Sequence, residues 1–330
     1  MIGTRKRAGA LAALAAGIIW GFLGPFVRGC EEMGLTTSQM TCLRYIVVVA
    51  VLAPFVWRGR RSASRLDRRS ILLLAGMGTI GIAANSTLYF QSMTMIPLSA
   101  STVLQYLAPF VVVALSIPLF HERRSLAKTA AVIVAFTGCV LCSGLLSSQG
   151  PIDLAGIAFG AASGFCFALY TLCSKALARD EHRPTEVLFY SGLISIVCLA
   201  PFCDLPGGVA TAASSAESMA LLVGLGLGMT LLPFALYNFA LDRIEAGKTS
   251  IISFSEPLTA TAIGFAMYCE ALTIEVVAGM AMIMAALLAI NRDRGVAVAS
   301  RRRPSGRTRS GCARRRRCPW PWNSHRASRR

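Results

Sequence analysis

The stretch LYFQSMTMIPLSASTVLQYLAPF, residues 88–110, returns 148 positions later as LYNFALDRIEAGKTSIISFSEPL, residues 236–258. This alignment has no gap, and in both copies a glutamate stands thirteen residues beyond the shared proline. The amino-terminal part of the chain repeats at a shift of 147. The chain is therefore a duplication of one unit. The paired positions are Leu88 and Leu236, Tyr89 and Tyr237, Ile96 and Ile244, Pro109 and Pro257, Glu122 and Glu270, Gly17 and Gly164, and Arg28 and Lys175.

Composition places this duplicated unit in a membrane. Hydrophobic residues make up 55% of the 330 residues, charged residues make up 15%, and the mean hydropathy is +0.59. Soluble domains carry about 25% charged residues, so we predict an all-α integral membrane protein. A helix needs roughly 20 apolar residues to cross a bilayer. Ten segments qualify, and they are residues 8–27, 37–57, 70–92, 98–120, 125–145, 154–174, 185–203, 219–241, 249–269 and 272–290.

The basic residues of the connecting loops alternate along the chain, and this alternation predicts the orientation. Seventeen Lys and Arg residues lie in the amino terminus and the even-numbered loops, whereas the odd-numbered loops hold Arg28 alone. Cytoplasmic loops are enriched in Lys and Arg, so we expect both termini in the cytoplasm. A five-helix unit crosses an odd number of times, so its second copy enters from the opposite side. We therefore predict ten transmembrane helices in two inverted five-helix repeats, an architecture common among secondary transporters.

Most of the formal charge of +17 belongs to the last part of the chain, because residues 291–330 hold 14 Arg and one Asp. Such a segment cannot bury enough apolar surface to fold, so we predict a disordered tail that is dispensable or contacts lipid headgroups. The predicted domains are a cytoplasmic amino terminus at 1–7, a first repeat at 8–145, an extracytoplasmic linker at 146–152, a second repeat at 153–290 and the Arg-rich cytoplasmic tail at 291–330.

The sequence does not show the residue patterns of a metal site or an enzyme. Nine of the eleven cysteines lie between residues 30 and 269, mostly inside apolar runs, and three histidines accompany them. Free cysteine packs as a small hydrophobe, so the CxxC of Cys139 and Cys142 is interpreted as packing. The spans contain no HExxH, no GxSxG and no acidic cluster. We expect no metal, no cofactor and no catalytic residue.

The segment GIIWGFLGPFVR, residues 17–28, and the two segments APFVVVALSIPLFHE, residues 108–122, and EPLTATAIGFAMYCE, residues 256–270, resemble the EamA family of the drug/metabolite transporter superfamily. The resemblance covers about residues 8–290. It implies an inner-membrane permease for small metabolites or drugs, with a central cavity lined by the first, third and fourth helix of each half. The family usually has Gly before the final Glu of these segments, whereas His121 and Cys269 stand there in this chain.

Polar residues on the expected cavity helices are the candidate substrate-binding residues. Each of the uncharged ones has an alternative interpretation as an interhelical hydrogen-bonding residue. The candidates are Trp20, Asn85, Tyr89, Gln105, Tyr106, Tyr170, Tyr237, Asn238, Ser253 and Glu256.

Two charged residues lie inside predicted spans, where a charge costs about 2.5 to 3.5 kcal/mol. Arg44 is expected about 10 Å deep in the second span, where it snorkels outward, bonds a neighbouring helix or contacts the solute. Glu256 precedes Pro257, which frees a backbone carbonyl; we interpret Glu256 as a titratable cavity residue or a structural hydrogen-bonding residue. Glu256, Arg44, Pro109 and Pro257 are the coupling or gating candidates, and Glu122 and Glu270 are interpreted as structural or gating residues.

We thus expect a permease of the cytoplasmic membrane that moves a small organic solute by alternating access, driven by proton exchange at Glu256 or working by facilitated exchange. The alternative function is a non-transporting membrane scaffold that binds polyanions through the Arg-rich tail. The expected partners are the solute and the lipid bilayer; a homodimer is left open, and no specific nucleic acid is expected.

Overall fold

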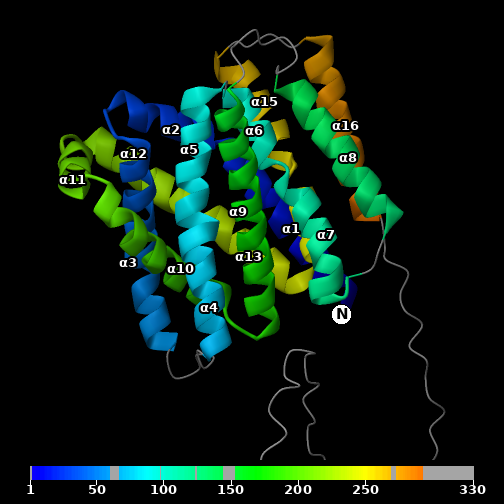
Figure 1. Cartoon of the computed structure of the whole chain (residues 1–330), viewed down its shortest axis with the longest axis horizontal. Coiled ribbons are helices and arrows are strands. Elements are labelled where there is room, and N and C mark those ends of the chain that lie inside the picture. Colours follow the sequence, from blue (N-terminus) through cyan, green and yellow to red (C-terminus); the bar gives the residue numbers. More distant parts are fainter. Residues whose placement is uncertain are drawn as a thin grey trace, which may run out of the picture. The chain divides into compact units, whose positions relative to one another are not determined.

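The computed structural model of the chain consists of helices throughout the residues that it describes (Figure 1). Those residues are 2–59, 67–96, 98–122, 125–143, 153–268 and 273–292. The predicted linker at 146–152, Cys269, Glu270 and residues 293–330 of the predicted tail lie outside them.

Seven helices of the described part are long and apolar enough to cross a membrane by length and composition, and they coincide with seven predicted spans. They are Thr4–Glu32, Thr37–Arg58, Arg68–Met95, Ala100–Phe120, Leu154–Arg179, Pro184–Phe202 and Ala216–Arg243. The fifth and tenth predicted spans are the shorter apolar helices α8 (Leu126–Cys142) and α16 (Ile274–Arg292). The ninth is divided into α14 (Ala246–Ile252) and α15 (Ser255–Tyr268). The all-helical membrane fold is confirmed, and the number of ten crossings stays a prediction.

The two halves share a common order of elements, except that α1 and α2 correspond to the single helix α9, and that η3 and α11 have no counterpart among the described residues of the first half. The first half consists of α1 (Ile2–Gly21), α2 (Leu23–Glu32), α3 (Thr37–Gly59), α4 (Arg68–Gly76), the π-helix η2 (Met77–Ala84), α5 (Asn85–Met95), α6 (Leu98–Gln105), α7 (Ala108–Phe120) and α8. The second half consists of α9 (Leu154–Arg179), α10 (Pro184–Leu199), the 3₁₀-helix η3 (Ala200–Phe202), α11 (Leu205–Ala213), α12 (Ala216–Gly226), the π-helix η4 (Leu227–Leu231), α13 (Leu232–Arg243), α14, α15 and α16.

Irregular backbone recurs at the same positions of both halves. The π-helices η2 and η4 interrupt corresponding helices. The fourth helix of each half is broken, between α6 and α7 and between α14 and α15. Proline explains both breaks, because Pro109 and Pro257 have no N–H to offer the carbonyls of Gln105 and Ser253 four residues earlier.

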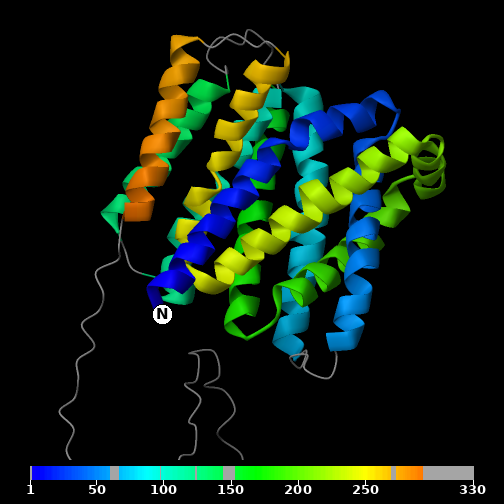
Figure 2. The ribbon, with the colours of Figure 1, turned by 180° about the vertical axis from the view of Figure 1, so that it is seen from behind.

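Each helix break is covered by a glycine of the other half. On α9, a Cβ at Gly164 would lie 2.9 Å from the carbonyl oxygen of Leu104 and 3.0 Å from that of Gln105, beside the α6–α7 break. On α1, a Cβ at Gly17 would meet Ser255 and lie 3.3 Å from the backbone nitrogen of Glu256, beside the α14–α15 break. Figure 2 shows α1 lying along α15. The two glycines are repeat counterparts, so the two halves interlock through equivalent contacts.

One difference between the halves concerns their first helices. The helix of the first half bends at Phe22, where α1 gives way to α2 (Figure 2). Its counterpart α9 is one uninterrupted helix of 26 residues. Pro25 lies just beyond the bend and has no N–H for the carbonyl of Gly21, whereas the counterpart of Pro25 in α9 is Leu172. The bend therefore has a local cause in the sequence.

We expect Gly164→Ala to destabilise the protein by about 1 to 3 kcal/mol, because the added methyl group overlaps two backbone carbonyls that cannot move independently. The matched control is Gly76→Ala on α4, since no atom lies within 4 Å of the Cβ position of Gly76. The apparent melting temperature in detergent is the measurement. Equal melting temperatures for the two variants would contradict the proposed packing.

His121 follows the last residue of α7 in the left-handed conformation, with φ 53° and ψ 36°. Glycine adopts this conformation without the steric cost that a Cβ imposes. We therefore expect His121→Gly to stabilise the protein by about 0.5 to 1 kcal/mol, measured as a higher apparent melting temperature. A fall in the melting temperature would show that the imidazole makes a contact worth more than the relieved strain.

Candidate functional site

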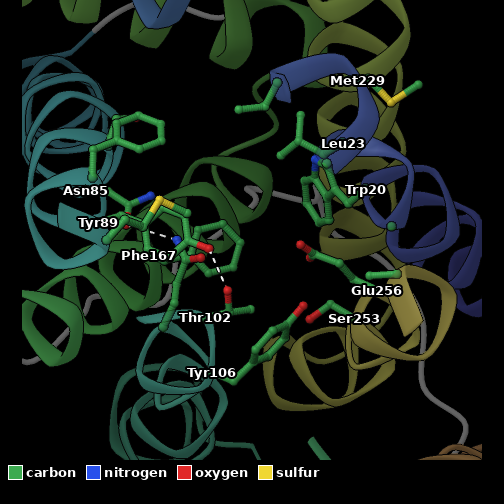
Figure 3. A pocket seen from close by; sticks show the side chains of 18 of the residues that line it. Trp20, Leu23, Asn85, Tyr89, Thr102, Tyr106, Phe167, Met229, Ser253 and Glu256 are labelled. Carbon is green, nitrogen blue, oxygen red and sulfur yellow. Dashed lines mark hydrogen bonds between the residues drawn. The ribbon is translucent and has the colours of Figure 1, made fainter. Parts of the chain in front are cut away.

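A cavity of about 430 Å³ lies where the two halves meet. Its walls come from the α1–α2 bend, α5, the α6–α7 break, the start of α13, and α15, so the irregular backbone of both halves borders it. Figure 3 shows the side chains that face each other across it. The volume falls in the range of about 300 to 1,000 Å³ that is typical of small-molecule sites.

Most of the predicted site residues line this one cavity. Glu256, Arg44 and Pro109 from the coupling or gating set all contribute to the wall, whereas Pro257 does not. The uncharged substrate-binding candidates in the wall are Trp20, Asn85, Tyr89, Gln105, Tyr106 and Ser253. The structure thus brings these residues together, and their binding of a solute stays a prediction.

The wall formed by the first half is held in place by two hydrogen-bonded pairs. Tyr89 Oη lies 2.9 Å from Thr102 Oγ1, which joins α5 to α6. Gln105 Nε2 donates to Asn85 Oδ1 at 3.4 Å, one helical turn deeper (Figure 3). These side chains are therefore oriented before any solute arrives, and each keeps further donor or acceptor capacity.

Glu256 occupies the first turn of α15, beside the break that follows α14. Its carboxylate lies on the same side of the cavity as the hydroxyl of Ser253 and the hydroxyl of Tyr106, which comes from the α6–α7 break of the first half (Figure 3). The Tyr106 ring stacks on Phe254 with centroids 5.0 Å apart, and its buried hydroxyl makes no well-aligned hydrogen bond within the described residues. A carboxylate and a phenol therefore form one polar corner of the cavity.

Arg44 projects from α3 into the same cavity. Its Nη2 lies 3.5 Å from Ser86 Oγ, and the guanidinium sits 5.4 Å from the centroid of the Tyr45 ring. Its Nε is buried and has no hydrogen-bond partner among the described residues. A buried donor without a partner is costly, so this guanidinium retains capacity for an anionic group.

Aromatic residues that polarity alone does not mark complete the wall. Phe167 and Phe234 lie 6.2 Å and 5.1 Å from the Trp20 ring by centroid distance, both at steep angles. Phe167 is the repeat counterpart of Trp20 at the shift of 147, so the duplication could have been used to predict Phe167 as a cavity residue. Nothing in the sequence distinguishes Phe234 or Met229 from other apolar residues.

Tyr170, Tyr237 and Asn238 do not line the cavity. They lie behind it, between α9 and α13, and are almost completely buried. Asn238 Oδ1 accepts from Ser174 Oγ at 2.8 Å, Asn238 Nδ2 donates to Tyr170 Oη at 3.1 Å, and Tyr237 Oη lies 3.1 Å from Thr171 Oγ1. In this conformation the three residues have the role of interhelical hydrogen-bonding residues.

The cavity reaches the exposed residues Arg28 and Glu31 on α2, at the end that the loop charges predict to be extracytoplasmic. At the opposite end the halves are joined. Glu122, next to the end of α7, accepts from the backbone nitrogen of Ala246 at 2.6 Å and from Lys128 Nζ at 3.4 Å, and Lys128 also pairs with Glu245. The cavity is therefore closed toward the predicted cytoplasmic side.

Two further contacts join the halves at the same end. Arg69 Nη1 lies 2.8 Å from Asp180 Oδ2, and Ser70 Oγ lies 2.8 Å from His182 Nε2. Asp67 caps α4 by accepting from the Ser70 backbone at 2.9 Å. The hydrogen bonds from Ser70 lower the pKa of the Asp67 carboxyl below its usual value, so this cap is retained at neutral pH.

Comparisons with known proteins agree with these features. A sequence profile of the EamA-like transporter family matches residues 7–144 and 154–292. An uncharacterised transporter of Archaeoglobus fulgidus is 28% identical over 87% of this chain and 97% of its own length. The threonine/homoserine exporter RhtA of Salmonella typhimurium is 28% identical over 78% of this chain and 82% of its own length. One crystal structure superposes with a TM-score of 0.70 at 18% identity, covering 86% of this chain and 96% of the other, which shows the fold alone.

We expect Thr102→Cys to react with a membrane-impermeant maleimide added outside intact cells, because Thr102 lines the cavity and the cavity opens on the predicted outer side. Thr171→Cys, in the buried cluster between α9 and α13, is the matched control and should label no more than the parent protein, whose native cysteines set the background. No cysteine lies among the residues that line the cavity. Labelling of the Thr102 variant no higher than that of the Thr171 variant would contradict the predicted opening of the cavity to the outer side.

Proposed function

Because the chain belongs to the EamA-like transporter family and is a multi-pass membrane protein, we propose that it is a secondary transporter that exports a small zwitterionic metabolite in exchange for protons. The observation that carries this proposal is the cavity at the junction of the two halves, with a carboxylate and a guanidinium in its wall. The protein is not proposed to catalyse a reaction on its solute.

The charges of the cavity favour a solute that carries both signs. Glu256 can pair with an ammonium group, and the Arg44 guanidinium, which also borders the cavity, can pair with a carboxylate. A solute with one charge would leave the other protein charge buried and unpaired, which costs several kcal/mol. Requiring both charges therefore discriminates against neutral and singly charged molecules of the same size.

The uncharged part of the wall suits a small side chain that is amphipathic. Trp20, Phe167 and Phe234 supply apolar surface, and Tyr89, Asn85 and Gln105 supply hydrogen-bonding groups. A hydroxylated amino acid satisfies both kinds of contact. The relative RhtA is named an exporter of threonine and homoserine, which are solutes of this kind, and this likeness supports the proposed class.

Proton coupling follows from competition at one group. The Glu256 carboxyl can hold a proton or pair with the ammonium group of the solute, but it cannot do both. If the solute leaves on the outer side and a proton replaces it, the empty protein returns to the inner side with the proton bound. Transport is then an exchange of solute for protons, and an inwardly directed proton gradient drives export.

Alternating access supplies the motion. The repeats have opposite orientation, so exchanging their conformations converts a cavity open to one side into a cavity open to the other. A solute at the junction is then exposed to each side in turn without leaving its site.

We expect Glu256→Gln to lower proton-driven transport at least about tenfold, because the amide neither binds a proton nor pairs with an ammonium group. The measurement is transport of a panel of amino acids into proteoliposomes with and without a pH gradient. The panel includes esters that lack the carboxylate and acids that lack the amine, and both are expected to be poor solutes.

The matched control is Glu275→Gln, which removes an exposed carboxylate on α16 that does not border the cavity. Full pH-dependent transport by the Glu256 variant would refute proton coupling at this residue. Transport of singly charged analogues at the rate of the parent amino acid would refute the zwitterionic solute class.

A further inference from the structure

Lys175 makes a contact that closes the predicted cytoplasmic end within the second half. It lies near the end of α9 and is 8% exposed. Its Nζ donates to the backbone carbonyls of Leu241 and Ile244, the latter at 2.6 Å, where α13 ends. The last carbonyls of a helix have no partner within the helix, so the ammonium group satisfies acceptors that would otherwise be unpaired. This contact holds the end of α9 against the end of α13.

The first half contains the same docking surface. The end of α5 is the repeat counterpart of the end of α13, and both helices stop at an isoleucine in extended conformation. Ile96 has φ −135° and ψ 162°, and Ile244 has φ −126° and ψ 170°. Their backbone nitrogens donate to the carbonyls four residues earlier at 3.0 Å and 2.8 Å. The carbonyls of Met93 and Ile96 therefore correspond to those that Lys175 bonds.

The carbonyl of Met93 has a further reason to need an external donor. In a continuing helix its partner would be the N–H of the residue four positions later, and that residue is Pro97. Proline has no N–H. The Met93 carbonyl can therefore accept a hydrogen bond from another helix, in the way that the carbonyls at the end of α13 accept from Lys175.

Arg28 is the repeat counterpart of Lys175, yet it does not occupy the corresponding place. It is exposed on α2, which bends away at Phe22 and packs on α12, with Phe26 against Gly224. Arg28 and Met93 both border the cavity. Figure 2 shows α2 leaving the line of α1 and crossing toward α12. The bend therefore holds the mouth of the cavity open.

The bend has the properties of a hinge. Pro25 leaves the carbonyl of Gly21 without its helical partner. No atom of another element lies within 4 Å of the Cβ position of Gly24, whereas Gly21 and Gly29 on either side pack against Thr259 and Leu221, so the open space is confined to the bend. Hinges of this kind are a few positions that absorb a change in backbone angles between two states.

We propose that Arg28 closes the outer mouth in the inward-facing state: α2 swings onto the end of α5, and the guanidinium donates to the carbonyls of Met93 and Ile96. Lys175 makes the equivalent contact in the outward-facing state described here, and each state keeps one of the two contacts. The inference rests on the proposed alternating access. It assigns Arg28 to the gate and not to the solute site, although Arg28 borders the cavity.

The test uses Thr102→Cys as a reporter of the outward-facing state, because its labelling from outside needs no solute. In this background Lys175→Ala is expected to slow labelling by the impermeant maleimide about tenfold, since the outward-facing state loses a charge-assisted contact. Adding Arg28→Ala is expected to raise the labelling rate about tenfold again, back to that of the Thr102→Cys parent, because the inward-facing state then loses its own contact. A merely structural role for Arg28 would not reverse the effect of the Lys175 variant.

The conservative variant sharpens the result. Arg28→Lys in the Lys175→Ala background should label as slowly as Lys175→Ala alone, because a lysine, Lys175, makes the equivalent contact in the second half. Arg58→Ala, which removes an exposed arginine from α3, is the matched control and should leave the rate unchanged. Lys175→Gln replaces Lys175→Ala if the latter is not recovered as folded protein.

The proposal is overturned if the Lys175 variant labels as fast as its parent, if Arg28→Ala does not accelerate labelling in that background, or if Arg28→Lys behaves like Arg28→Ala. Because none of these measurements uses a solute, a gate that behaves as expected together with failed amino-acid transport would refute the proposed function and leave the gate intact.

Discussion

The fold depends on how the protein satisfies broken helical backbone inside a membrane. A bilayer offers no hydrogen-bond partners, so irregular backbone at that depth must be covered by protein or face a water-filled cavity. The α6–α7 break and the α14–α15 break meet this requirement in two ways. One side of each is covered by a glycine of the opposite half, Gly164 or Gly17, and the other side borders the cavity. The cavity therefore lies at the junction of the halves.

Much of this arrangement could be predicted from the sequence, because duplication and hydropathy are properties of many residues together. The shift of 148 located both proline breaks, and seven long helices coincide with predicted spans. Polarity within a span marked Tyr89, Tyr106 and Glu256, because a polar group there needs a partner or a cavity. The apolar part of the wall could not be predicted in this way, because Phe234 and Met229 resemble every other apolar residue of a span. They line the cavity because the path of the backbone places them there.

The least predictable part is the difference between equivalent residues. Tyr89 and Tyr237 occupy the same repeat position, yet Tyr89 borders the cavity and Tyr237 is packed between α9 and α13. The sequence repeat identifies equivalent residues, but which of them border the open cavity depends on the conformation of the protein. The bend of the first helix has a small local cause, because Pro25 has Leu172 as its counterpart in α9. One missing N–H is enough to make one first helix bend while the other stays straight.

The charges of the cavity lie outside the duplicated pattern. Glu256 has Ala108 as its counterpart, and Arg44 has Ser191 at the shift of 147. Each charge is costly in a membrane by itself, so its presence in only one half needs a reason that the scaffold does not supply. Opposite charges in two different walls allow a dipolar solute to bind in only one direction. A shared fold consequently says little about the solute, since the charged residues that we propose to select it are those that the duplication does not repeat.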